Sequence, residues 1–370
     1  MKRTVAGFVL LHLAFFVLPS CHSKPIVTSG RNVRILVHDS EGNLDSAVSG
    51  IEVVRLSFRS SQTPFDVGSI SKMLYLAHRY YLLDSKFNII KAFDDKGAYL
   101  FDIGTIGVVD SAFIRVEDIA YNSYNQTLWV VCNNPSKVVE FSLDGRFIRV
   151  VHPGFFASGV SFAGPGEYFY YVNQNNSSQA EGQNLLFTVD EGRVLGKYFG
   201  FPPGDTAMIE YTGGLYTTGN HVYFNPPFTG RYFSLTGDSI DEAYTIQFGP
   251  DSLRQVHPRD YYPGRLFIET NKYLVFNTIS PTLVKSVVYD KTSGRLYSSN
   301  NNRSILGFLS DCGVGTQTDD GIVFLKDLSL YKPSPGDDHN AMKVRYPDAY
   351  KQVFTTDSTA RFSLVKMHLR

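Results

Sequence analysis

The chain has 370 residues, of which 35 are basic and 35 are acidic, so its formal net charge is zero. This balance argues against a nucleic-acid-binding protein, which would show a strong basic field. Aromatic residues make up 14% of the chain and glycine occurs 31 times, a composition that favours a large globular core of strands and tight turns.

The first segment has the organisation of an export signal. Two basic residues precede an apolar run over residues 5–18, which is shorter than an ordinary transmembrane helix. The run leads into Pro19-Ser20-Cys21, and a small residue directly before Cys resembles the bacterial lipobox. We therefore expect residues 1–20 to be a lipoprotein signal peptide, with Cys21 carrying lipid that holds the protein on a membrane. The alternative is an ordinary secretory signal in which Cys21 has no role.

Residues 21–49 are polar and predict a lipidated Cys followed by a tether, before a domain over residues 50–370. A short strand is possible within this tether at 33–37. Two further cysteines, Cys132 and Cys312, are too far apart in sequence to indicate a disulfide framework. We expect them to be two buried thiols rather than a bridge.

A repeat is visible along the rest of the chain. Glycines recur in short polar turns at intervals of between 45 and 57 residues, each between the last two strands of a unit. These glycines are Gly97, Gly145, Gly192, Gly237 and Gly294. A period in this range, with about four strands per unit, is typical of a propeller blade. In one unit the four strands are expected at 114–121, 127–131, 137–142 and 147–151.

Five units are visible, so a sixth must be assembled from the two ends of the chain. The strand at 50–58 has no unit of its own, and neither has the strand at 361–369, while 319–325 supplies an inner strand. Pairing 50–58 with 361–369 closes a ring and removes open sheet edges. The sequence therefore predicts an all-β, six-bladed β-propeller with four-stranded blades, the last closed by N-terminal and C-terminal strands. The segment 333–354 stays open between a strand at 343–346 and a helix at 341–353 broken at Pro347.

The lipobox and the repeat together carry a resemblance. Cys21, followed by units with Leu-Asp-Ser at 83–85, Phe-Asp at 93–94 and Lys-Gly at 96–97, resembles the six-bladed β-propeller lipoproteins of gut-type Gram-negative bacteria, distant relatives of NHL-repeat propellers. The resemblance covers roughly residues 50–370. It implies an envelope protein anchored in the outer membrane, on its periplasmic or its surface side.

The chain departs from that family at one element. Family members usually carry Gly-x-Gly-Pro-Gly-Glu-Tyr after the first complete blade, whereas residues 104–111 lack the Pro-Gly-Glu. A Gly-Pro-Gly-Glu-Tyr is present at 164–168, inside the third unit, where we expect it to form a turn after an inner strand. Any function tied to this element is therefore not carried over.

A polar residue closes the second strand of each unit. In a four-stranded blade these positions lie on one face of the disk, so they are candidates for a polar ring at the mouth of the central channel. The ring residues are Asp84, Asn133, Asn173, Asn225 and Asn277. The alternative is that Asp and Asn cap their own turns through backbone hydrogen bonds.

No catalytic or metal-binding motif is present in the sequence. His-x-x-x-His, Cys-x-x-Cys, Gly-x-Ser-x-Gly and Walker A patterns are all missing. We therefore expect a non-enzymatic binding module for a protein or glycan, without a cofactor and with a monomeric domain. The long loops at 173–183 and 299–321 are candidate contact regions. The alternatives are an NHL-like or lactonase-like enzyme with a metal in the central channel, and an envelope scaffold without a small ligand.

Overall fold

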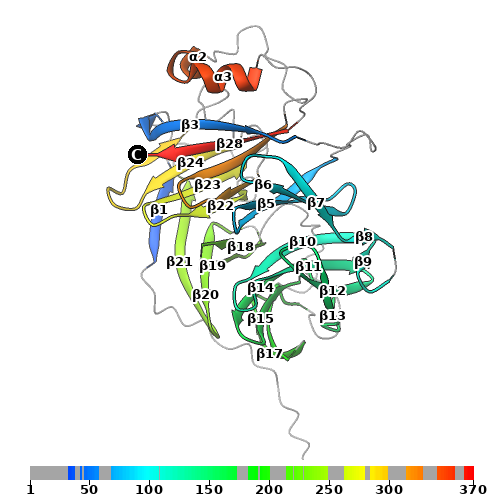
Figure 1. Ribbon diagram of the computed structural model, residues 1–370. Helices are drawn as coiled ribbons and strands as arrows, with labels where there is room; N and C mark the ends of the chain where they lie inside the picture. Colours follow the sequence, from blue (N-terminus) through cyan, green and yellow to red (C-terminus); the bar gives the residue numbers. More distant parts are fainter. Residues whose placement is uncertain are drawn as a thin grey trace, which may run out of the picture.

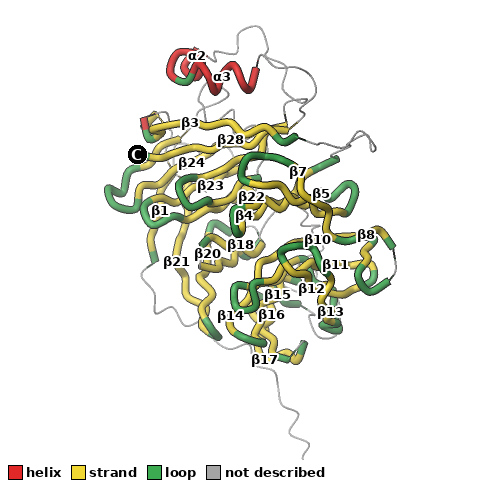
Figure 2. Tube along the Cα trace, in the orientation of Figure 1, coloured by secondary structure: helices red, strands yellow, loops and turns green. Residues whose placement is uncertain are grey.

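The computed structural model describes residues 32–37, 42–43, 46–57, 68–107, 109–172, 182–190, 192–200, 214–219, 221–227, 229–248, 262–279, 284–298, 314–327, 340–354 and 362–370. Strands dominate these residues, and six large sheets are arranged around a common centre (Figures 1 and 2). The chain is an all-β, six-bladed β-propeller, as predicted.

The first five blades follow one another along the chain, and each runs from its innermost to its outer strand. The first blade contains β4 (Ile70–Leu76), β5 (Arg79–Asp84), β6 (Ile89–Asp94) and β7 (Tyr99–Ile103). The second contains β10 (Arg115–Asn122), β11 (Thr127–Asn134), β12 (Ser136–Ser142) and β13 (Phe147–Val151). The third contains β14 (Gly159–Gly164), β15 (Glu167–Tyr171), β16 (Leu185–Val189) and β17 (Arg193–Tyr198). The fourth contains β18 (Gly214–Thr218), β19 (His221–Asn225), β20 (Arg231–Thr236) and β21 (Ser239–Phe248). The fifth contains β22 (Tyr262–Glu269), β23 (Tyr273–Ile279), β24 (Val284–Asp290) and β25 (Leu296–Ser298).

The sixth blade joins the two ends of the chain. Its order is β26 (Gly315–Gln317), β27 (Ile322–Asp327), β28 (Phe362–Leu369) and β3 (Val48–Arg55). The pairing of β28 with β3 is antiparallel and confirms the predicted closure. The inner strand expected at 319–325 is shifted, because Asp319 and Asp320 lie in the bend between β26 and β27 and the innermost strand is β26.

The innermost strands form a closed ring. Each of them contacts the next in the order β4, β10, β14, β18, β22 and β26, and β26 returns to β4. A ring of six places the fourth blade opposite the first and the fifth opposite the second. Between the first two blades the chain forms a short parallel pair, β8 (Thr105–Ile106) with β9 (Ala112–Phe113).

The five repeat glycines occupy the positions that the sequence assigned to them. All five have a positive φ, the region that residues with a side chain avoid. At Gly97 the need is also steric, because an added Cβ would lie 2.2 Å from the carbonyl oxygen of Arg55. The Gly164–Tyr168 element likewise forms the turn between β14 and β15, as expected.

Two strands extend the fourth and fifth blades. β1 (Val33–Val37) pairs in parallel with β21, and β2 (Gly42–Asn43) pairs in parallel with β25. The strand expected at 33–37 is confirmed, but it belongs to the propeller and not to a free tether. The reason is burial: Ile35 and Val37 are 1% and 3% exposed, and they pack into the cluster between these two blades. Residues 1–31, with Cys21, lie outside the described residues.

The core lies between neighbouring blades. Among the described residues, buried side chains form six clusters, and each joins two adjacent sheets. Aromatic rings carry much of this packing. Trp129 of the second blade meets Phe162 of the third edge to face at 5.0 Å, and Tyr232 of the fourth blade stacks on Phe267 of the fifth at 4.1 Å.

The segment left open by the sequence is helical. α2 (Asn340–Arg345) and α3 (Pro347–Phe354) are separated at Tyr346, directly before Pro347, in agreement with the broken-helix alternative. Ala349 and Val353 of α3 join the cluster between the fifth and sixth blades, so the helix covers part of the outer rim. Within the described part of the chain, no helix has the length and apolar character needed to cross a bilayer.

Candidate functional site

Three of the five residues of the predicted polar ring, Asp84, Asn225 and Asn277, form hydrogen bonds within their own blades. Asp84 is fully buried, and its carboxylate accepts hydrogen bonds from the backbone N–H groups of Gly68 at 2.7 Å and Ser69 at 3.2 Å. The same carboxylate also accepts from the N–H groups of Lys86 at 3.1 Å and Phe87 at 3.2 Å, in the turn that follows it. The side chain therefore fixes the entry into β4 and the turn after β5, as the turn-capping alternative describes.

Two asparagines of the ring behave in the same way. The Asn225 amide donates to the carbonyl of Arg231 at 2.8 Å, and Asn277 Oδ1 accepts from the N–H of Leu266 at 3.0 Å. Both residues are buried. Asn133 is partly exposed, and its buried Oδ1 has no hydrogen-bond partner among the described residues. Asn173 lies outside the described residues, together with most of the two long loops at 173–183 and 299–321.

A different set of polar side chains lies on the innermost strands. Lys72 of β4 reaches across to Asp118 of β10, with 2.6 Å between Nζ and Oδ1. The second carboxylate oxygen of Asp118 faces β14, where a Cβ added to Gly159 would lie 3.0 Å from Oδ2. Three consecutive blades thus meet at one buried carboxylate beside the axis of the ring, which lies close to the backbone of Gly159.

A second ion pair lies directly before Asp118 on β10, between Arg115 and Glu117. Arg115 Nε is 2.6 Å from Glu117 Oε1, and the Arg115 side chain is 71% exposed. We call Lys72, Arg115, Glu117 and Asp118 the axial cluster. It offers ammonium and guanidinium donors and carboxylate acceptors within one small area, a set that suits hydroxyl, amide and charged groups of a ligand.

The environment of Asp118 disfavours its charge. Burial raises the pKa of the Asp118 carboxyl, the Lys72 ammonium opposes this shift, and the neighbouring Glu117 charge adds to it. Perturbed carboxyls of this kind are enriched at functional sites. The sequence analysis did not identify this site. The signal for it was that Lys72 and Asp118 are charged residues within strands that also contain apolar residues.

Another buried charge joins the fourth and fifth blades. The hydroxyls of Tyr223 and Tyr244 both donate to the carboxylate of Glu269, and Lys291 Nζ lies 2.9 Å from Glu269 Oε1. Burial alone would raise the pKa of Glu269, but the three hydrogen bonds and the Lys291 charge outweigh burial and lower it. The same contacts, with burial as the largest cause, raise the pKa of both tyrosines. This group ties two blades together.

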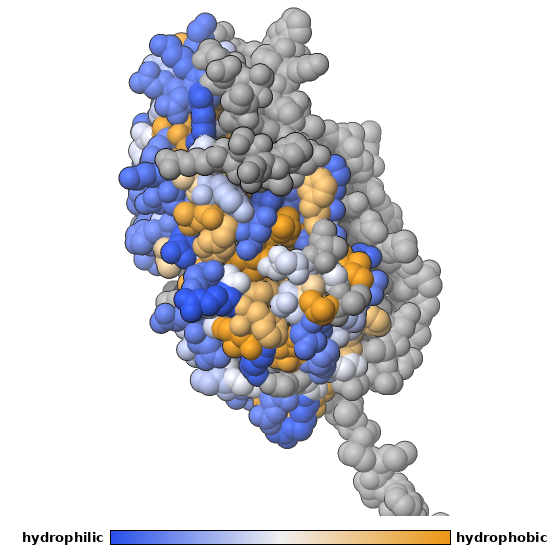
Figure 3. Space-filling model, turned by 45° about the vertical axis from the view of Figure 1, so that its right-hand side comes forward, coloured by the Kyte–Doolittle hydropathy of each residue, from blue (hydrophilic) through white to orange (hydrophobic). Residues whose placement is uncertain are grey.

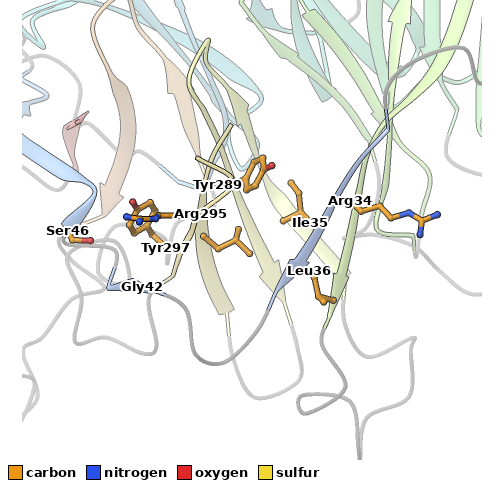
Figure 4. A pocket seen from close by; sticks show the side chains of 10 residues that line it. Arg34, Ile35, Leu36, Gly42, Ser46, Tyr289, Arg295 and Tyr297 are labelled. Atoms are coloured by element: carbon orange, nitrogen blue, oxygen red, sulfur yellow. The ribbon is translucent and has the colours of Figure 1, made fainter. Parts of the chain in front are cut away.

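A pocket opens on the outer rim beside this junction (Figure 4). It has a volume of about 700 Å³ and lies between β1 and the outer strands of the fifth blade. Ile35 and Leu36 line one side, and Tyr289, Arg295 and Tyr297 line the other. In Figure 4 Arg295 lies beside Tyr297, whereas Arg34 extends to the far side of β1.

The described residues contain no group of three His, Cys, Asp or Glu side chains placed to hold a metal ion. Cys132 is a free, buried thiol, as expected, and burial raises its pKa to about 12. Cys312 lies outside the described residues.

Comparison with solved structures places the fold among propellers from Bacteroides. A protein of Bacteroides fragilis NCTC 9343, described as a candidate exported protein, superposes with a TM-score of 0.70 at 16% identity, covering 91% of this chain and 100% of that one. A member of the DUF4221 family from Bacteroides vulgatus ATCC 8482 superposes with a TM-score of 0.51 at 10% identity, covering 87% of this chain and 97% of that one. These likenesses concern the fold alone.

No curated protein sequence matches the chain. A family model described as a domain of unknown function, DUF4934, matches residues 33–329, and the chain belongs to this family.

Proposed function

We propose that the protein is an exported lipoprotein of the outer membrane, whose propeller binds a protein or glycan partner at the axial cluster. Export and anchoring are supported by the apolar leader and by Cys21 in its lipobox setting. The likeness to the Bacteroides fragilis protein described as a candidate exported protein is consistent with export, and it says nothing about a lipid anchor.

The binding role rests on one observation, the Asp118 carboxylate next to Gly159. One oxygen is held by Lys72, and the other faces a position from which a side chain is missing. A donor group of a ligand, such as a sugar hydroxyl or a peptide N–H, would meet an acceptor already oriented by an ion pair. Propellers supply rigid strands for such a contact, so little ordering cost is added on binding.

The partner can be identified by screening the purified protein on glycan arrays and by pull-down from envelope extracts. Two variants then test whether the partner binds at the axial cluster. Asp118→Asn removes the charge, and Gly159→Ala places a methyl group against Oδ2 without changing charge. We expect each to weaken binding at least tenfold, by about 1.4 kcal/mol or more.

The matched control is Asp320→Asn, which removes a carboxylate that pairs with Lys366 on the sixth blade, away from the axial cluster. We expect it to leave the affinity unchanged. Unaltered binding by both Asp118→Asn and Gly159→Ala, with thermal unfolding confirming the fold, would refute the site. Metal analysis of the purified protein separates this proposal from the enzyme alternative, because stoichiometric Ca²⁺ or Zn²⁺ would favour the latter.

A further inference from the structure

The described chain enters the propeller at the outer rim of the fourth blade. The Asn32 amide donates to Glu242 Oε1 at 2.8 Å and to Thr245 Oγ1 at 3.0 Å, and β1 begins at the next residue. Val33–Val37 is then fixed along β21 by five consecutive residue pairs. Any pull on the chain before residue 32 is therefore applied at this rim, and not at either flat face of the disk.

The distance from Cys21 to this entry point is short. Eleven residues from Cys21 to Asn32 span at most about 40 Å when fully extended, and about 20 Å as a flexible coil. A compact domain of this size has a radius of gyration of about 20 Å, which corresponds to a width of about 50 Å. The segment from Cys21 to Asn32 is thus shorter, even when fully extended, than the domain is wide. The rim opposite the fourth blade therefore cannot be turned toward a membrane that holds Cys21.

The entry rim carries the side chains expected at a lipid headgroup layer. On β1, Arg34 and Leu36 are exposed while Ile35 and Val37 point inward. Across the pocket, Arg295 lies beside Tyr297 (Figure 4). Neither Arg34 nor Arg295 forms an ion pair within the described part of the chain, so both guanidinium groups are available. Tyrosine and basic side chains are enriched at membrane interfaces.

The sequence before the rim adds to this charge. Residues 22–32 contain Lys24 and Arg31 and no acidic residue. A basic segment next to a lipid anchor is attracted to the anionic headgroups of the membrane surface.

Apolar exposure alone does not select this side of the molecule. Figure 3 brings the right-hand side of Figure 1 forward, and apolar side chains lie among polar ones on that face. On β13 of the second blade, Phe147 and Ile148 are 44% and 46% exposed, similar to the 41% of Leu36. What distinguishes the fourth and fifth blades is the point where residue 32 enters the fold, which keeps this rim near the segment that follows Cys21.

We propose that the outer rim formed by Arg34, Leu36, Arg295 and Tyr297 lies against the anionic headgroups of the membrane in which Cys21 is anchored. This orientation rests on the lipid anchor of the proposed function. The propeller then stands on its rim, and the axis of the ring runs along the membrane. The first and second blades then lie on the side away from the bilayer, and the membrane does not cover the axial cluster beside the ring axis.

The test uses the lipidated full-length protein, purified and reconstituted into vesicles of phosphatidylethanolamine and phosphatidylglycerol. A bimane label is attached at Leu36→Cys, or at Ile148→Cys as the control of similar exposure on the second blade, in a Cys312→Ser background. Cys132 is buried and does not compete for the label. Lipids with a nitroxide headgroup then quench labels that lie near the surface.

We expect quenching at position 36 to exceed quenching at position 148 at least threefold. This ratio should fall in the double variant Arg34→Ala, Arg295→Ala. It should not change in the control double variant Arg146→Ala, Arg193→Ala, which removes the same charge from the second and third blades. Incorporation of labelled palmitate shows separately whether Cys21 is lipidated. If it is lipidated, equal quenching at the two positions, or stronger quenching at 148, overturns the orientation alone. Absence of palmitate incorporation overturns the anchor and the orientation together.

Discussion

Val365 of β28 lies directly opposite Val53 of β3, so the last strand of the chain is paired along its length with a strand from near its beginning. On its other side Val365 faces Phe324 of β27. β28 is therefore a central strand of the sixth blade, and β3 is its outer strand. The ring is held closed by this blade, because the four main strands of each of the first five blades come from one continuous stretch of chain.

A charge at position 365 should open the ring. Val365 is fully buried between the fifth and sixth blades, so Val365→Asp places a carboxylate in an apolar cluster and should lower the free energy of unfolding by more than about 4 kcal/mol. Val344→Asp is the control, since Val344 of α2 is 81% exposed and the change should cost less than about 0.5 kcal/mol. Urea unfolding followed by circular dichroism measures both. Similar stabilities of the two variants would contradict the assignment of the sixth blade as the closure.

The features predicted correctly from the sequence are those set by local chemistry. Each repeat glycine marks a turn with positive φ, and each turn fixes the register of the two strands beside it. In the second blade the predicted strands match the observed ones within three residues at every end. Closure followed from one further argument, that strands without a unit of their own must pair to avoid open edges.

The features that the sequence did not predict depend on contacts between distant segments. Val33–Val37 alternates inward and outward like any short strand, and nothing near it in the sequence indicates β21 as its partner. Lys72 and Asp118 come together only because β4 and β10 lie side by side at one level, which is set by the packing of two blades. Asp84 was found correctly as a strand end, but its burial and its backbone partners required the fold.

The assignment of β1 to the propeller has a direct test. Ile35 is 1% exposed, and Ile35→Ala should cost about 2–4 kcal/mol because it leaves a cavity between the fourth and fifth blades. Its neighbour Leu36 is 41% exposed, so Leu36→Ala should cost less than about 0.5 kcal/mol. If β1 were part of a free tether, both changes would be neutral in chemical denaturation.

Cys132 should react only when the protein unfolds. The thiol is 1% exposed, and burial raises its pKa to about 12, so the thiolate is scarce at pH 8 and closed to reagents. A maleimide should leave Cys132 unmodified in buffer and modify it fully in 6 M guanidinium, as read by mass spectrometry of the peptide that contains it. Rapid modification of the native protein would show that the cluster between the first two blades opens.

Glu269 should make the protein more stable as the pH rises. Burial would raise its pKa, but the hydrogen bonds from Tyr223, Tyr244 and Lys291 hold it below the ordinary value. Its contribution is therefore present above the unfolded-state pKa of about 4.3 and is lost as the pH falls through the folded-state pKa. Glu269→Gln should cost about 2 kcal/mol at pH 7, and the cost should shrink toward pH 3. Urea midpoints between pH 3 and pH 7 measure this, and a cost independent of pH would contradict it.

Asp118 should show the opposite dependence on pH, which makes it a matched test of the axial cluster. Burial raises its pKa above the unfolded-state value of about 3.9, and Lys72 only partly offsets the shift. The protonated acid is therefore the better fit to the fold, and the stability that it contributes is lost as the pH rises through the folded-state pKa. Asn resembles the protonated acid, so the stability of Asp118→Asn relative to the wild-type protein should improve from pH 3 to pH 7. In the same series the relative stability of Glu269→Gln should worsen. If both variants changed in the same direction with pH, burial would not be holding Asp118 against its charge, and the position of this residue in the fold would be contradicted.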